Sequence, residues 1–149
     1  MFFKKNKDEN ENENLIKISA LLIHAAKIDQ NYSSKEKKII KQTLNKISED
    51  KDIETIIKNA EKIEDNSNQI LDFTKEVKNL PNQDKIIIVE SLWSIIYSNN
   101  EADIYETNLM RRLAGLLYID NKTMGDIKEK IKQNSKWLIS LMTSALSVN

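Results

Sequence analysis

From Leu15 onward, the apolar residues of this chain recur at steps of three and four, which is the spacing of one face of an α-helix. The 149 residues include only two glycines and one proline, too few for the many tight turns that a sheet requires. The apolar segment from Ile86 to Tyr97 exceeds the usual length of a strand and contains no turn signal. The pattern predicts a compact all-α domain, a single bundle of about seven or eight helices with the segment 86–97 at its centre.

Clusters of Asn, Asp and Ser interrupt this spacing and divide the chain into separate helices. Pro81 is expected to end the fourth of them, because a proline restricts the residue before it. The sequence leaves open whether the last apolar element is separate or continues the seventh helix. The expected helices cover residues 15–28, 34–48, 50–63, 66–80, 82–97, 104–117, 120–131 and 137–146.

The two ends of the chain differ in pattern from the middle. Residues 1–13 alternate acidic and amide side chains in their second half, which predicts a disordered tail. Residues 14–133 carry the helical domain. Residues 134–149 form an amphipathic helix that could pack on that domain or on a partner. Packing on the domain is expected, because an exposed apolar surface of such size is unusual in a monomer.

The composition excludes several classes of site. The chain has no cysteine, so it has no disulfide, thiolate nucleophile or cysteine-based metal site. His24 is the single histidine and, beside Lys17 and Lys27, is expected on the solvated side of the first helix. No nucleophile has an evident base beside it, so we expect no catalytic residue and no enzymatic activity.

Charge and hydropathy also limit partners and location. The 23 Lys and Arg residues balance the 23 Asp and Glu residues, so no basic field indicates nucleic acid binding. No apolar stretch approaches the roughly 20 residues of a transmembrane helix. Lys4 and Lys5 follow the first apolar residues at once, so no secretory signal develops. We therefore expect a cytoplasmic protein.

Two parts of the chain repeat one pattern. At one constant offset, Leu22 aligns with Leu92 and Glu36 aligns with Glu106. Each copy has an apolar helix, a short polar turn and a second apolar helix. The repeat predicts a bundle built around two similar helical hairpins.

The repeated segments also carry more specific motifs. In the second segment, a Leu-Trp pair is followed by acidic turn residues and then by Arg-Arg-Leu-Ala. The residues concerned are Leu21–Asp29 and Glu36 in the first segment, and Leu92–Ser98, Glu101, Asp103, Glu106 and Leu109–Leu117 in the second. Over about residues 15–133, the chain resembles the tellurite-resistance TerB family and the similar N-terminal domain of the DjlA co-chaperone.

The resemblance implies a compact helical module without established catalytic activity, linked to tellurite and general stress responses. It also implies acidic turns that have been suspected of binding metal. In this chain, however, Gln30 replaces the glycine of the first Asp-Gly turn, and Asn99-Asn100 replaces the second. Tyr118 stands where the family often ends its helix with glycine. Fewer carboxylates imply a weaker site for a hard cation.

The positions of the carboxylates in these turns can be explained in two ways. Ser33 and Glu36, like Asp103 and Glu106, have the spacing of a helix capping box, which explains their positions without a ligand. The same turns could in addition hold a divalent cation (Ca²⁺, Mg²⁺ or Zn²⁺), the one cofactor that the sequence suggests. The candidate metal ligands are Asp29, Glu36, Glu101, Asp103 and Glu106.

Arg111 and Arg112 are the only arginines of the chain. Either they contact a partner's carboxylate or phosphate, or they pair with Glu106 or Asp103. The sequence thus predicts a non-enzymatic stress-response interaction protein, with a divalent-metal-binding regulatory protein as the alternative. We expect a protein partner and a monomer or weak homo-oligomer.

Overall fold

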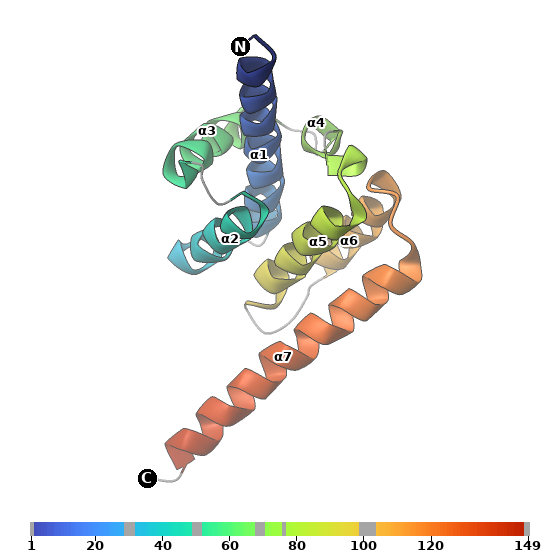
Figure 1. Cartoon of the computed structure of the whole chain (residues 1–149). Helices are drawn as coiled ribbons and strands as arrows, with labels where there is room; N and C mark the ends of the chain where they lie inside the picture. The colour runs from blue at the N-terminus through green and yellow to red at the C-terminus, as the bar shows by residue number, and fades with distance from the viewer. Residues whose placement is uncertain are drawn as a thin grey trace.

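The structure, a computed structural model, describes the backbone of residues 2–28, 32–48, 52–67, 71–75, 77–98 and 104–147. It describes the side chains of residues 12–28, 32–48, 52–67, 72–75, 77–98 and 105–134. All regular elements in the described ranges are helical (Figure 1). In chain order they are α1 (Phe2–Ile28), α2 (Ser34–Ile47), α3 (Ile53–Asp65), α4 (Leu71–Thr74), the 3₁₀-helix η1 (Val77–Asn79), α5 (Asn82–Tyr97), α6 (Ile104–Leu116) and α7 (Asn121–Ser147).

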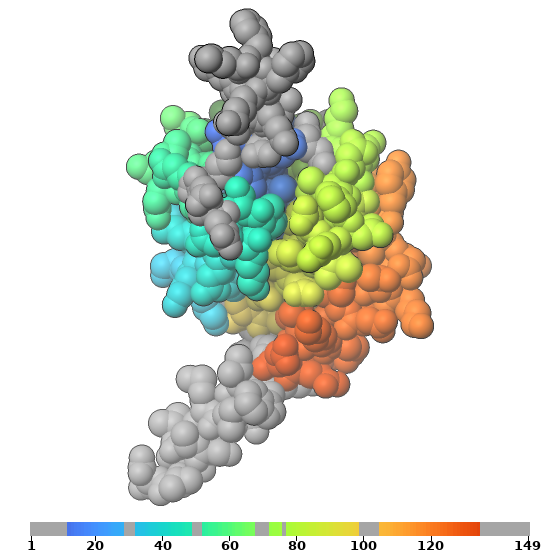
Figure 2. Space-filling model, viewed as in Figure 1, coloured from blue at the N-terminus to red at the C-terminus, as the bar shows by residue number. Residues whose placement is uncertain are grey.

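The prediction of an all-α fold is confirmed, and its core is formed around α1 and α5. α1 packs against α2, α3, α4, α5 and α6, whereas α5 packs against α1, α2 and α7. Most faces of α5 are buried, as its nearly continuous apolar sequence predicts. Figure 2 shows the described side chains of these helices packed into one body. The expected grouping of the helices into two similar hairpins stays a prediction. α6, which would belong to the second hairpin, also packs against α1 of the first.

The N-terminal segment differs from the expected disordered tail. The backbone of α1 begins at Phe2 and continues without a break into the buried part of the helix, which starts at Leu15. Packing fixes α1 from Leu15 onward, so each preceding residue extends an existing helix and adds no new nucleation cost. Glutamate and lysine, frequent in this segment, are also favourable helix residues.

The segment before Pro81 differs as well. In place of one helix over 66–80, the structure has the single turn α4 and the 3₁₀ turn η1. Phe73 in α4 and Val77 in η1 are both fully buried. Asp, Thr and Asn in this stretch have low helix propensity, so burial of these two anchors decides the backbone path.

The last two expected helices form one continuous helix, α7. Asp120 caps its start, because its carboxylate accepts a hydrogen bond from the backbone N–H of Thr123 at 3.3 Å. No proline follows within the helix, so nothing stops it before Ser147. Figure 1 shows the C-terminal half of α7 running away from the other helices. The expected packing of residues 134–149 on the domain stays a prediction, because the side chains of residues 135–149 lie outside the described residues.

The end of α6 is an unusual helix terminus. Tyr118 has φ 57°, the left-handed conformation that glycine normally supplies. The N–H of Ile119 donates to the carbonyl of Ala114 at 2.9 Å, and the N–H of Tyr118 to that of Gly115 at 3.4 Å, which together form a Schellman motif. Buried Lys85 donates from Nζ to the carbonyl of Leu117 at 2.9 Å, and its Nζ lies 5.9 Å from the centre of the Tyr118 ring.

We expect Tyr118→Gly to stabilise the protein. The change removes a left-handed conformation that costs a residue with a Cβ about 1–2 kcal/mol. It also removes a cation–π contact of about 0.5–1 kcal/mol. The net gain should be up to about 1 kcal/mol, or roughly 2–4 °C in melting temperature. Tyr118→Phe, which keeps the conformation and the ring, is the control and should melt like the parent.

A core truncation tests the central position of α5. Leu92 is fully buried, so Leu92→Ala should lower the free energy of unfolding by about 2–5 kcal/mol through lost burial and a residual cavity. Asn108→Ala on the exposed side of α6 should change it by less than about 0.5 kcal/mol. Urea unfolding of both variants measures the difference, and equal midpoints would contradict this placement of the core.

Candidate functional site

The capping box predicted at the start of α2 is present and reaches beyond its own helix. The Oε2 atom of Glu36 accepts hydrogen bonds from the Ser33 hydroxyl and, at 3.1 Å, from the Ser33 backbone N–H. Its Oε1 atom accepts a hydrogen bond of 2.9 Å from the Ser98 hydroxyl at the end of α5. Lys35 Nζ donates to the Ser98 carbonyl at 2.6 Å. The turns that follow α1 and α5 are therefore joined at one place.

Glu36 is only 2% exposed, although it carries a carboxylate. Burial alone raises its pKa, but hydrogen bonds from Ser33, from backbone N–H groups and from Ser98 outweigh this effect, so the pKa lies below the ordinary value. The carboxylate is therefore ionised at neutral pH. Both of its oxygens accept hydrogen bonds, so the cap accounts for the burial of Glu36 without a metal ion.

The other predicted metal ligands are only partly placed. Glu106 is 2% exposed in α6, and its charge contributes, after burial and Glu129, to a raised pKa of Tyr97 in α5. Asp29, Glu101 and Asp103 lie outside the described residues. Over the part of the chain that was described, no group of three or more His, Asp or Glu side chains is arranged to hold a metal ion.

Arg111 and Arg112 lie on the exposed side of α6. The predicted pairing of these arginines with Glu106 is not among the ion pairs of the described residues, and the alternative partner Asp103 lies outside those residues. The two side chains remain open to solvent, as a contact with a partner molecule would require.

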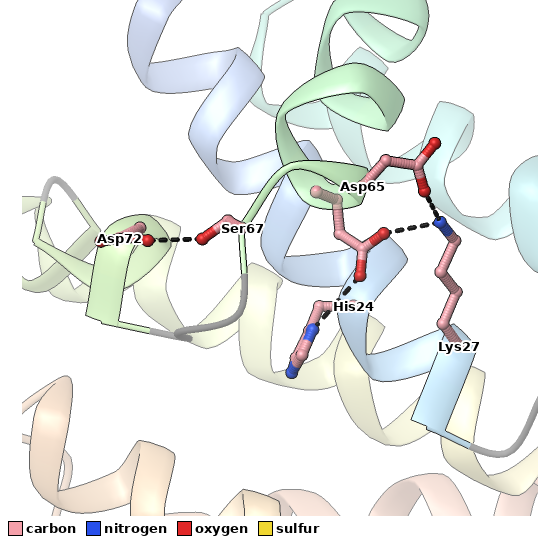
Figure 3. A network of polar contacts seen from close by, with 6 residues as sticks. His24, Lys27, Asp65, Ser67 and Asp72 are labelled. Carbon is pink, nitrogen blue, oxygen red and sulfur yellow. Dashed lines mark hydrogen bonds and ion pairs between the residues drawn. The ribbon is translucent and has the colours of Figure 1, made fainter.

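A second polar cluster, missed by the sequence analysis, joins α1 to α3 (Figure 3). Glu64 of α3 is nearly buried, and its carboxylate lies 3.3 Å from His24 Nδ1 and 2.6 Å from Lys27 Nζ. Lys27 also contacts Asp65 at 2.6 Å, and hydrogen bonds to Asp65 and Glu64 raise its pKa. His24 is thus half-buried, with 26% of its side chain exposed, and it contacts Glu64 besides solvent. Because Glu64 continues the buried stripe of Ile57 and Ala60, a cationic partner could have been expected.

This cluster continues to α4 and supports the fold. Lys17 Nζ of α1 donates to the backbone carbonyl of Asp72 at 3.1 Å, and Ser67 donates to the Asp72 carboxylate. The His24 ring also lies 6.3 Å from the Phe73 ring, centre to centre. These bonds fix the short α4 turn against α1, and their donors and acceptors are used within the protein.

The family of the chain follows from a match over its main body. The family model described as tellurite resistance protein TerB matches residues 15–129. The chain belongs to the TerB family. Among curated proteins and solved structures, none matches it.

The TerB match begins where α1 becomes buried and ends within α7. It contains both turns that Glu36 and Ser98 connect, whereas the last turns of α7 lie beyond it. Within the residues searched, no helix is long and apolar enough to cross a membrane. The TerB fold of this chain therefore holds one buried, fully hydrogen-bonded carboxylate at the junction of its two turns.

Two substitutions of Glu36 separate capping from metal ligation. Glu36→Gln keeps an acceptor for the Ser33 N–H, so it should cost only a few tenths to about 1 kcal/mol of unfolding free energy. Glu36→Ala removes the cap and should cost about 0.5–2 kcal/mol. Thermal melts with and without EDTA measure both. If Gln were as harmful as Ala, and EDTA removed both effects, Glu36 would be a metal ligand.

The difference in stability between the parent and Glu36→Gln should depend on pH in a defined way. Because the pKa of Glu36 is lowered on folding, its stabilising effect is complete above the unfolded pKa of about 4.3 and is lost as pH falls through the folded pKa. The difference in stability between parent and Glu36→Gln should therefore be constant near neutral pH and shrink in acid. If this difference in stability grew in acid instead, the Glu36 carboxyl group would not be held in the folded protein as an ionised carboxylate.

Proposed function

We propose that this TerB-family protein is a non-enzymatic helical module that acts in the cytoplasm by binding another protein, in a stress response of the tellurite-resistance type. The observation that supports the proposal is the path of α7, whose C-terminal half leaves the body of the protein (Figure 1). A helix that extends from a domain is available to a partner's groove.

The sequence of this half has the composition of a docking helix. Over residues 136–147, the apolar residues fall on one side of an ideal helix, and Ser140, Thr143, Ser144 and Ser147 fall on the other. The apolar set is Trp137, Leu138, Ile139, Leu141, Met142, Ala145 and Leu146. An amphipathic helix recognises a groove through anchors at such spacing.

The proposal is tested by tellurite tolerance in cells that depend on this protein. Leu138→Asp/Leu141→Asp should abolish tolerance, because two charges in the apolar stripe would prevent docking. Ser140→Asp/Ser144→Asp adds the same charge to the opposite side of an ideal helix and should preserve tolerance. Both variants should melt like the parent, because the C-terminal half of α7 runs away from the other helices (Figure 1). Equal tolerance of the two variants would contradict the proposal.

A divalent-metal-binding regulatory protein is the second candidate. It is favoured by the hydrogen bond between Glu36 and Ser98, because this bond brings the turns after α1 and α5 to one place. Carboxylates from both turns could then share a Ca²⁺, Mg²⁺ or Zn²⁺ ion. The EDTA comparison of the Glu36 variants distinguishes this function from a purely structural cap.

A further inference from the structure

A cavity lies where α5, α6 and α7 meet, away from the turns described above. It has a volume of about 160 Å³. Its apolar wall includes Trp93 of α5, Met110 of α6 and Met124 of α7. These side chains are themselves buried, so the cavity has a fixed wall on three helices.

One polar group in this wall has no partner. Trp93 is 3% exposed, and its indole Nε1 makes no hydrogen bond with the described residues. The indole ring stacks on Tyr97, with ring centres 5.8 Å apart and planes inclined by 25°. A buried N–H group without an acceptor is rare in proteins, and indole can only donate. The Nε1 atom is covered by neighbouring atoms, whereas the Trp93 side chain lines the cavity, so its indole signal reports on what enters there.

Among the described residues that line the cavity, every charged one is cationic. Arg111 of α6 and Lys128 of α7 line it, and no Asp or Glu of the described chain does. Lys128 Nζ lies 5.4 Å from the centre of the Trp93 ring. Arg111 is exposed and makes no ion pair with the described residues. An anionic group therefore meets two positive charges in one place.

We propose that this cavity binds a small organic carboxylate with an apolar body. Arg111 and Lys128 attract its carboxylate, and Trp93 and the two methionines contact its apolar part. The mostly apolar lining favours such a ligand over an inorganic anion, which would have to give up its hydration without apolar contacts in return. Methionine side chains also adapt well to a ligand of irregular shape.

Gly125 of α7 offers a way to close the cavity without disturbing the helix. It lines the cavity, and a Cβ added there would meet no atom within 4 Å. Gly125→Leu should therefore fill the space from a position where the larger side chain is tolerated, and leucine is a better helix residue than glycine.

The experiment uses the full chain carrying Trp137→Phe, which leaves Trp93 as the only indole. In an ¹H–¹⁵N spectrum, the single indole N–H signal then reports on Trp93. Benzoate is the probe, and benzamide, of the same shape without charge, is its control. We expect benzoate to shift the indole signal saturably at millimolar concentration. Benzamide and inorganic phosphate should bind at least about tenfold more weakly, the factor that corresponds to about 1.4 kcal/mol.

Two matched variants locate the binding. Arg111→Gln should weaken benzoate binding at least threefold, whereas Arg112→Gln, next to it and outside the cavity lining, should leave it unchanged. Gly125→Leu should abolish the shift while melting at or above the parent temperature. The proposal is overturned by any of three results: no saturable shift, equal effects of benzoate and benzamide, or full binding to a stable Gly125→Leu variant.

Discussion

The packing of α1 against α5 is the contact on which the rest of this structure depends. α5 is buried on most sides, α1 is buried on several sides from Leu15 onward, and each of the other helices contacts one of the two. Leu21, Leu22 and Ile23 of α1 are consecutive and all fully buried, which is possible only for a helix that is covered on several sides. The polar groups of the protein must therefore be accommodated at the ends and edges of these two helices.

Three buried polar groups meet this requirement in the same way. Glu36 connects α2 to the end of α5, Glu64 connects α3 to α1, and Lys85 connects α5 to the end of α6. Burying any one of these charges without a partner would cost free energy, and each is paired with a group on another helix or turn. A shift of one helix along its neighbour would leave such a group unpaired, so these contacts favour one alignment of the helices over others.

The sequence predicted the features that depend on local spacing. The boundaries of α2 and α5 agree with it to within a residue, and the Ser33–Glu36 capping box is present, because each follows from residues three or four positions apart. The turn at Phe73, the pairing of His24 with Glu64 and the continuity of α7 depend on what lies opposite each segment. Spacing along one helix contains no such information, so these were missed or left open.

The candidate sites, too, were predicted from the sequence only where they depend on residues close together in the chain. The capping role of Glu36 is readable from the sequence, whereas its bond to Ser98 joins residues far apart in the chain. The cavity beside Trp93 was not predicted, because it is formed by residues of three helices, and the Leu-Trp motif indicated only a packed aromatic residue. Arg111 was identified as a contact residue from its type alone, and the structure adds the difference between Arg111, which lines the cavity, and Arg112, which does not.

The two regions proposed to bind ligands and partners share one helix. α7 supplies Met124 and Lys128 to the cavity and then continues to Ser147, beyond the end of the TerB match at residue 129. Its first turns are thus fixed by the family fold, while its last turns belong to the part of the chain outside that match. A continuous helix holds both ends in a constant relative direction, because each residue adds a fixed rise of about 1.5 Å and a fixed rotation. The orientation in which the C-terminal half of α7 is presented therefore depends on how its first turns pack against Trp93.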